Sequence, residues 1–108
     1  KAKLAENMKD YLDENFRINI TNQFLAERFG FVGSYLGSIF KSYYEVTPIE
    51  YVVQKRMDEG KKLLETGEMK IKEVAAWLGY EDSLYFSKVF KRVIGMSPKD
   101  YVNKGGRN

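Results

Sequence analysis

Apolar residues recur at helical spacing along almost the whole chain, and glycine, proline or a polar turn separates each apolar stripe from the next. A stripe with a period of about 3.6 residues is typical of an amphipathic helix that buries one face. The first stripe runs from Lys1 to Phe16, and the longest one begins at Pro48. The pattern predicts an all-α chain with helices at about 1–16, 22–29, 34–44, 48–65, 71–78, 83–94 and 99–103.

Two of these segments are short and meet at a tight turn that begins with Gly79. Such a pair indicates a helix-turn-helix unit. Its second helix, Ser83 to Ile94, contains no acidic residue and has two unlike faces. The apolar face holds Phe86, Val89, Phe90 and Val93, and the opposite face holds Leu84, Ser87, Lys88 and Lys91, flanked by Tyr85 and Arg92. A helix with an apolar back and a neutral or basic front suits the major groove of DNA.

The same layout occurs about 50 residues earlier in the chain. Matching stretches are Ala26, Gly30 and Phe31 with Ala75, Gly79 and Tyr80, Phe40-Lys41 with Phe90-Lys91, Val46-Thr47-Pro48 with Met96-Ser97-Pro98, and Tyr51-Val52 with Tyr101-Val102. The helix at 34–44 also has two faces, with Leu36, Ile39, Phe40 and Tyr43 on the expected buried side and Ser34, Gly37, Ser38 and Lys41 opposite, beside Ser42. This internal repeat predicts two helix-turn-helix units in tandem.

The longest predicted helix, from Pro48 to Glu65, lies between the two units. At about 1.5 Å per residue it is roughly 27 Å long, which is compatible with two recognition helices spaced by one DNA turn of about 34 Å. Gly60 inside it predicts close packing of the helix backbone against a neighbour.

Composition narrows the possible functions. The 108 residues include no cysteine and no histidine, which excludes a disulfide framework, thiol and imidazole catalysis, and zinc sites built from these ligands. A site built from carboxylates alone is the remaining alternative, but no pair of acidic residues stands out in the sequence. We therefore expect a protein that is not an enzyme and that needs no cofactor or metal. The net charge of +3 is concentrated near the end, because residues 82–108 hold six basic and two acidic residues. This distribution fits phosphate contact, and a solvated lysine-rich face is the alternative.

Four motifs together resemble the AraC/XylS family of bacterial transcription regulators: IKEVA at 71–75, GYED at 79–82, YFSKVFK at 85–91 and GMSPKDY at 95–101. Within that family the chain is most similar to the YesN-type response regulators, in which this domain follows a receiver domain. The resemblance implies a seven-helix domain. Its parts would be a first helix-turn-helix subdomain at 1–47, a rigid linker helix at 48–66, a second subdomain at 67–103 and a flexible tail at 104–108.

The resemblance also implies which residues contact DNA, through recognition helices at about 33–44 and 83–94. The base-contacting positions are Ser34, Gly37, Ser38, Leu84, Tyr85, Ser87 and Lys88. The helix positions and helix starts that suit phosphate contact are Thr21, Asn22, Lys41, Ser42, Lys72, Lys91 and Arg92.

Several of these assignments have alternatives. Lys88 suits guanine, or it is simply solvated. Leu84 suits a thymine methyl group, or it packs against the turn at Glu81 and Asp82. Tyr35 and Tyr85 lie at the edge of the core stripe and are expected to act mainly in packing.

The chain departs from the family pattern in four places. Glu45 replaces a glycine, Val32 a capping serine, Lys70 a serine or threonine, and Val102 an arginine. The two recognition helices are also unequal. The first carries only Lys41, and the second carries three cations, so the second subdomain is expected to supply more of the affinity.

We therefore expect sequence-specific binding of double-stranded promoter or operator DNA by the output domain of a cytoplasmic transcription regulator. RNA polymerase would be a partner if the regulator is an activator, and no membrane contact is expected. The isolated domain would be monomeric and the full-length protein a dimer. The competing interpretation is a helical protein–protein interaction module. RNA binding is disfavoured because the aromatic residues are interpreted as core positions.

Overall fold

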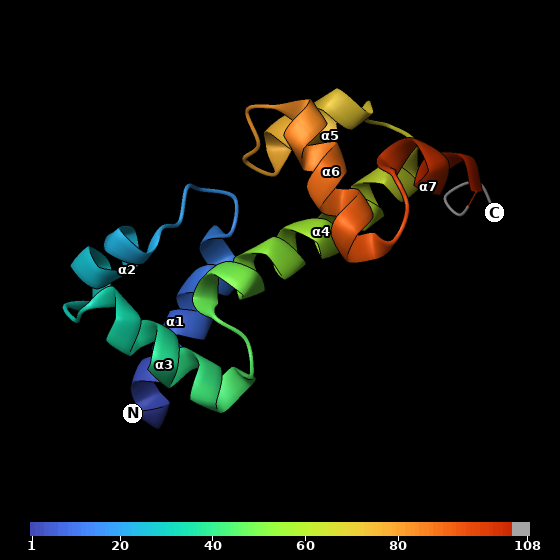
Figure 1. The fold of residues 1–108 in the computed structure, drawn as a ribbon. Helices are drawn as coiled ribbons and strands as arrows, with labels where there is room; N and C mark the ends of the chain where they lie inside the picture. The colour runs from blue at the N-terminus through green and yellow to red at the C-terminus, as the bar shows by residue number, and fades with distance from the viewer. Residues whose placement is uncertain (105–108) are drawn as a thin grey trace. The chain divides into compact units, whose positions relative to one another are not determined.

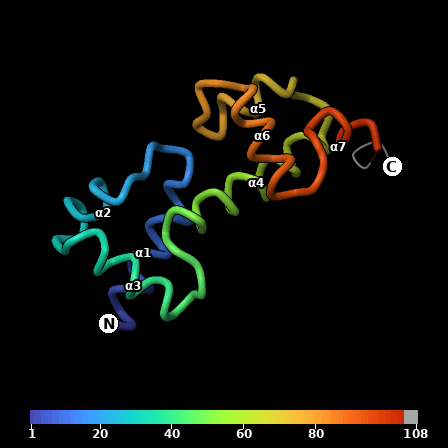
Figure 2. The backbone as a smooth tube through the Cα atoms, in the orientation of Figure 1, coloured from blue at the N-terminus to red at the C-terminus, as the bar shows by residue number. Residues whose placement is uncertain are grey.

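The computed structural model describes residues 1–104 (Figures 1 and 2), and every regular element in that part of the chain is a helix. The seven helices are α1 (Ala2–Asn15), α2 (Asn22–Phe29), α3 (Gly33–Tyr44), α4 (Pro48–Thr66), α5 (Ile71–Trp77), α6 (Ser83–Ile94) and α7 (Pro98–Lys104). The all-α prediction is confirmed, and each predicted helix lies within one or two residues of its observed bounds. The predicted tail lies outside the described residues, except Lys104, which ends α7.

The chain divides into two compact units, residues 1–55 and the residues from 56 onward, and the boundary falls inside α4. In the first unit, α1 and α2 both pack against α3. Leucine, isoleucine, methionine, phenylalanine and valine side chains from four helices and one loop form its core: Met8, Leu12, Ile20, Leu25, Leu36, Phe40 and Val52. Burial of these side chains from helices that are individually amphipathic is what holds the unit together.

In the second unit, α6 packs against both α5 and α7. Its buried apolar residues are Met57, Leu64, Val74, Ala75, Leu78, Phe86, Val89 and Phe90. The expected close packing at Gly60 is confirmed, because a Cβ atom there would lie 3.1 Å from Cδ1 of Leu78. Glycine in this helix therefore makes room for the side chain of Leu78.

The internal repeat is present in the structure as well as in the sequence. The helices α3 and α6 each contain twelve residues and begin 50 residues apart, at Gly33 and Ser83. Residues 31–40 and 81–90 show the same order of buried, half-buried and exposed side chains, position by position. The two recognition helices therefore present the same face to solvent, each within its own unit.

The helix starts differ between the repeats in how their free backbone N–H groups are satisfied. At α2, the hydroxyl of Thr21 accepts a hydrogen bond from the N–H of Phe24 at 3.0 Å, as the sequence predicts. At α5, Lys70 offers no acceptor, and the carboxylate of Glu73 accepts from the backbone N–H of Lys70 at 2.8 Å instead. At α3, Val32 provides no side-chain cap.

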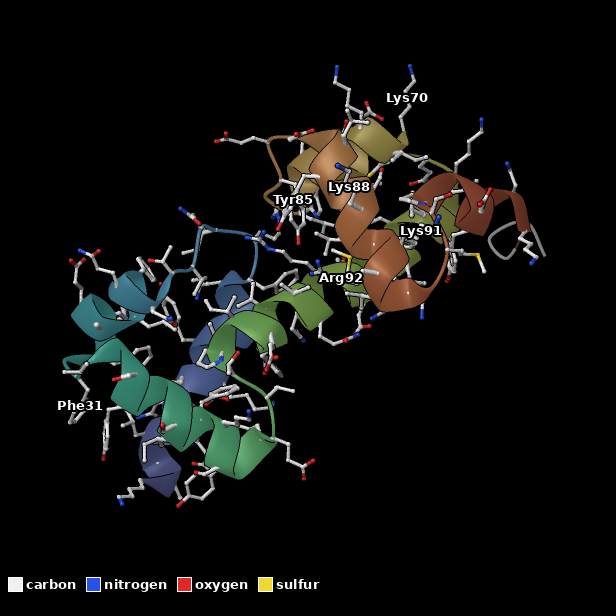
Figure 3. All side chains as sticks on the ribbon, viewed as in Figure 1. Phe31, Lys70, Tyr85, Lys88, Lys91 and Arg92 are labelled. Carbon is white, nitrogen blue, oxygen red and sulfur yellow. The ribbon has the colours of Figure 1, made fainter. Side chains whose placement is uncertain are left out.

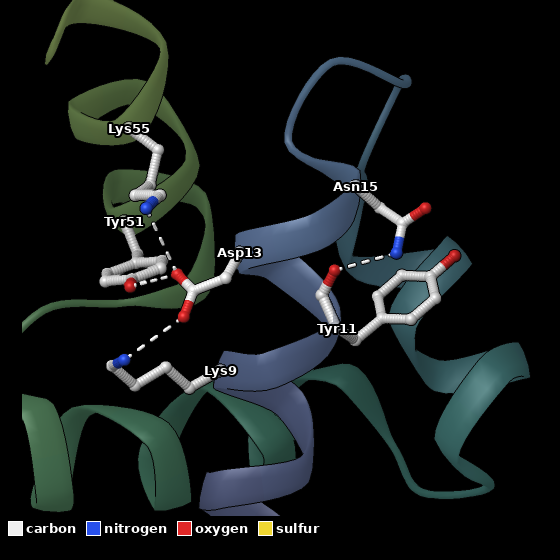
Figure 4. A network of polar contacts seen from close by, with 6 residues as sticks. All are labelled: Lys9, Tyr11, Asp13, Asn15, Tyr51 and Lys55. Atoms are coloured by element: carbon white, nitrogen blue, oxygen red, sulfur yellow. Dashed lines mark hydrogen bonds and ion pairs between the residues drawn. The ribbon is translucent and has the colours of Figure 1, made fainter. Parts of the chain in front are cut away.

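A polar network ties α1 to α4 within the first unit (Figure 4). The carboxylate of Asp13 lies 3.2 Å from the ammonium of Lys9 and 3.4 Å from that of Lys55, and it accepts a hydrogen bond from the hydroxyl of Tyr51. Partial burial acts to raise the pKa of Asp13, but the two hydrogen bonds and the neighbouring positive charges outweigh burial and hold that pKa below its usual value. In the second unit, Tyr101 is the counterpart of Tyr51 and donates to Glu65.

One position expected in the core is exposed. Tyr43 follows the apolar stripe of α3, yet 48% of its surface is accessible. Periodicity assigns a residue to a face of the helix, but only tertiary packing decides whether another element covers that face at the last turn.

Candidate nucleic-acid interface

The outward face of α6 begins with an apolar side chain. Leu84 is 73% exposed, which rules out the alternative that it packs against the turn at Glu81 and Asp82. Asp82 instead caps the helix, because its carboxylate accepts from the backbone N–H groups of Leu84 at 2.9 Å and Tyr85 at 3.4 Å. Capping fixes the start of α6 and leaves the side chain of Leu84 free to contact a ligand.

The cationic side chains of α6 follow along the same helix (Figure 3). Lys88 is exposed, and Ser87 beside it is half-buried. Lys91 and Arg92 are exposed in the last turn of the helix. The order along α6 is therefore an apolar group first, then a hydroxyl and an amine, and then two cations, which fits base contact near the helix start and phosphate contact near its end.

Tyr85 contacts a second ring while remaining accessible. It is 55% exposed, and its ring centroid lies 6.0 Å from that of Tyr80. Tyr80 itself stacks against the guanidinium of Arg56 at 4.9 Å, and burial raises the pKa of Tyr80. Tyr85 is therefore positioned by a packed ring and also open to solvent.

The outward face of α3 is formed by smaller groups. Ser34, Ser38 and Lys41 are exposed, and Gly37 between them is half-buried. A Cβ atom at Gly37 would have no atom within 4 Å, so the space in front of this residue is open. Ser42 is exposed, and its hydroxyl donates to the carbonyl oxygen of Ile39 at 2.7 Å.

The start of α3 exposes apolar surface that the sequence reasoning did not assign to the site. Val32 is 71% exposed, Phe31 48% and Tyr35 40%, and the rings of Phe31 and Tyr35 lie 5.4 Å apart. Figure 3 shows Phe31 at this end of the helix. In the internal repeat Phe31 corresponds to Tyr80, but the turn before α3 is one residue shorter than the turn before α6. Phe31 is exposed, whereas Tyr80 is half-buried. The rings of Phe31, Tyr35 and Tyr85 are exposed, so the aromatic residues are not all core positions. Core placement of the aromatic residues is therefore no longer a reason to disfavour RNA binding.

The remaining phosphate candidates lie at helix starts. Thr21 and Asn22 are exposed at the start of α2, and Lys72 is exposed in the first turn of α5. Within residues 1–104, no group of acidic side chains is arranged to hold a metal ion. No helix in the described part of the chain is long and apolar enough to cross a membrane.

The arrangement defines a class of protein: a helical domain with two equivalent helices that expose matching faces. Residues 25–104 match the family described as helix-turn-helix domain. The chain belongs to the AraC-family helix-turn-helix DNA-binding domains, a family without enzymatic activity.

The chain is similar to transcription regulators that are longer than itself. The uncharacterized HTH-type transcriptional regulator YdiP of Escherichia coli K12 is 38% identical over 101 residues, which cover 94% of this chain and 33% of that protein. The chain spans about a third of the length of the curated relatives it matches.

Two solved structures of response regulators have the same fold. The C-terminal domain of AraT, a response regulator from Geobacillus stearothermophilus, superposes with a TM-score of 0.88 at 28% identity, covering 93% of this chain and 84% of that one. The C-terminal domain of the two-component response regulator yesN from Fusobacterium nucleatum gives a TM-score of 0.84 at 33% identity, covering 90% of this chain and 95% of that one. The predicted resemblance to the AraC family and to its response regulators is confirmed.

Proposed function

We propose that this chain binds double-stranded operator DNA at specific sequences, with α3 and α6 reading successive segments of the major groove. The observation that carries the proposal is the repeated outward face: two twelve-residue helices, 50 residues apart, expose equivalent positions in the same order. Recognition helices contact bases mainly through their N-terminal residues, and Ser34, Leu84 and Tyr85 near the two helix starts are exposed.

The residues predicted to contact DNA keep their roles in this proposal. Base contacts are assigned to Ser34, Gly37, Ser38, Leu84, Tyr85, Ser87 and Lys88, and phosphate contacts to Thr21, Asn22, Lys41, Ser42, Lys72, Lys91 and Arg92. Lys88 is the candidate for donation to guanine, and Leu84 is the candidate for apolar contact with thymine. Exposure at both positions supports these roles.

The domain organisation is part of the same proposal. The segments 1–47 and 67–103 act as the two DNA-reading subdomains, and 48–66 acts as their linker helix. The similarity to the C-terminal domains of AraT and yesN supports a role as the output domain of a cytoplasmic two-component response regulator. Signal reception and dimerisation would belong to the rest of the protein, and contact with RNA polymerase would follow if it activates transcription.

The salt dependence of binding to a random-sequence duplex tests DNA binding directly. A protein that neutralises 6–10 phosphates loses roughly 10³- to 10⁵-fold in affinity between about 50 and 200 mM salt. We expect a loss in this range, measured by fluorescence anisotropy with a labelled duplex. A flat response would favour the protein–protein interaction module instead.

A matched single-stranded RNA of the same length serves as the second probe in this assay. Exposed aromatic rings provide stacking surfaces for unpaired bases, so RNA is a physical competitor for DNA. We expect the duplex DNA to bind more tightly than the RNA. Tighter binding of the RNA would overturn the assignment of double-stranded DNA as the ligand.

A further inference from the structure

The outward surface at the start of α3 has a chemical character of its own. No residue from Gly30 to Phe40 carries a charge or a side-chain amide. We use the name α3 face for its outward residues, which are Phe31, Val32, Ser34, Tyr35, Gly37 and Ser38. Five of these six are exposed, and Gly37 is half-buried.

The side chains that usually distinguish bases by paired hydrogen bonds are absent from this surface. Arginine and lysine pair with guanine, asparagine and glutamine with adenine, and acidic groups with cytosine. Apolar side chains recognise thymine, because only thymine among the four DNA bases presents a C5 methyl group in the major groove. Val32 and the adjacent, tilted rings of Phe31 and Tyr35 supply such apolar groups, and all three side chains are accessible.

The equivalent positions of α6 are more polar at three places and more apolar at one, where Leu84 corresponds to Ser34. Asp82 corresponds to Val32, Ser87 to Gly37 and Lys88 to Ser38. α3 and α6 have the same length. The substitutions between them therefore change the chemistry of the outward surface more than its backbone.

Gly37 leaves open space on the α3 face. It belongs to the α3 face, and a Cβ atom added there would have no neighbouring atom within 4 Å. A helix needs no glycine for its own folding at such a position, and glycine there is less favourable than alanine by roughly 1 kcal/mol. A glycine does allow the backbone to approach a ligand closely.

We infer that the α3 face selects thymine in its half of the operator by apolar contact with the C5 methyl group, and that Gly37 lets the helix backbone approach the base closely enough for that contact. The inference rests on the proposed DNA binding and specifies what the first helix recognises. It assigns Phe31 and Val32 to the interface. Base selection by α3 then requires no charged side chain.

The test begins with selection of tightly bound duplexes from a random library by the 108-residue chain. Each thymine of the selected operator is then replaced by deoxyuridine, which removes the methyl group and keeps the hydrogen-bonding groups. Loss of one buried methyl corresponds to roughly a fourfold loss of affinity. We expect losses of about this size at one or more thymines, and we expect Val32→Ala to abolish the loss at some of them.

Variants at matched positions assign each effect to its helix. Leu84→Ala should abolish the uracil effect at a different thymine, in the other half of the operator. Gly37→Ala should weaken operator binding by roughly tenfold or more, since the added methyl occupies the space of close approach, while the thermal midpoint stays equal or rises. Tyr43→Ala, which changes an exposed ring on the other side of α3, should leave operator affinity unchanged.

The possible outcomes separate this inference from the proposed function. Failure to enrich any sequence would overturn sequence-specific binding and the inference together. An operator that binds equally well with uracil at every position would overturn the inference and leave DNA binding intact. The same holds if Val32→Ala leaves the uracil effect unchanged at every thymine, or if Gly37→Ala binds with wild-type affinity. 5-Methylcytosine carries the same methyl group, so a duplex with 5-methylcytosine paired with guanine at the affected position is included. Tighter binding to that duplex than to the thymine duplex would also overturn the assignment to thymine.

Discussion

Glu45 ends α3 with a φ of 71°, in the left-handed region that favours glycine. Its counterpart at the end of α6 is Gly95, with a φ of 102°. A residue with a side chain in this region destabilises the folded state by about 1–2 kcal/mol. Replacing it with glycine removes this strain, but it also raises the conformational entropy of the unfolded chain, which lowers the stability by about 0.4–1 kcal/mol. We expect Glu45→Gly to stabilise the protein by about 0.5–1 kcal/mol, measured by urea unfolding.

Gly95→Ala is the matched control for this prediction. It introduces at the end of α6 the strain that Glu45 carries at the end of α3, and it should destabilise the protein by about 1 kcal/mol. If Glu45→Gly is less stable than the wild type, the left-handed conformation at Glu45 is not the source of strain that we infer.

The hydroxyl of Tyr101 predicts a pH dependence. Its hydrogen bond to the carboxylate of Glu65, together with burial and the negative charge of Glu65, raises the pKa of Tyr101 to about 12. An unfolded tyrosine has a pKa of about 10. Because the folded pKa is the higher one, this stabilisation is fully present below about pH 10 and is lost as the pH rises through about 12.

Two measurements check this dependence. The difference in unfolding free energy between the wild type and Tyr101→Phe should be constant below about pH 10 and should narrow toward about pH 12. The step near pH 12 in a tyrosinate absorbance titration should be missing in Tyr101→Phe and present in Tyr43→Phe. An unchanged titration curve in Tyr101→Phe would contradict the assignment.

At the scale of elements, the two recognition helices begin differently although they are equivalent in length and exposure. Asp82 caps α6 through two backbone N–H groups, whereas Val32 gives α3 no side-chain cap. Loss of an N-cap side chain destabilises a protein by about 0.5–2 kcal/mol. We expect Asp82→Ala to lower the unfolding free energy by about 1 kcal/mol and Val32→Ala to change it little, in the same urea unfolding assay. Equal effects of the two substitutions would contradict the structural difference.

Most of the helix bounds were predictable because their signals are local. Prolines at the first position of α4 and α7, glycines after α2 and α6, and the hydroxyl of Thr21 each act on their own helix within one turn. Asp82 also caps a helix with its side chain, at the start of α6. The sequence pattern predicts only a turn at this residue. Glu45 shows the opposite case: its helix ends where predicted, although the usual glycine is absent.

At the scale of the whole molecule, the two units carry unequal charge on their recognition helices. α3 has Lys41, whereas α6 has Lys88, Lys91 and Arg92. We expect Lys88→Ala to weaken operator binding more than Lys41→Ala does. A base-contacting cation contributes about 1–3 kcal/mol of discrimination, while loss of a phosphate contact lowers the salt slope by about 1.

Anisotropy titrations of both variants against the selected operator, at several salt concentrations, measure this difference. Lys41→Ala should weaken binding to all sequences alike, and Lys88→Ala should relax the preference at one base pair. Equal losses of operator affinity in the two variants would contradict the predicted asymmetry.

The sequence by itself determined the helices, the tandem repeat and the sides of α3 and α6 that face outward. These features depend on residue spacing, and spacing is a local property that the chain carries whatever its tertiary structure. The resemblance added the roles of the outward residues, and their contacts with DNA stay predictions.

Only the tertiary structure decided which outward and edge positions are covered. Leu84 had two possible environments and is open to solvent, and Tyr43 lies on the apolar stripe yet is exposed. Phe31 is exposed, whereas its counterpart Tyr80 stacks on Arg56. Coverage depends on residues far away in the sequence, as does the bond between Tyr51 and Asp13, which lie 38 residues apart. Spacing within one helix carries no information about such partners, so the apolar surface at the start of α3 became visible only in the folded chain.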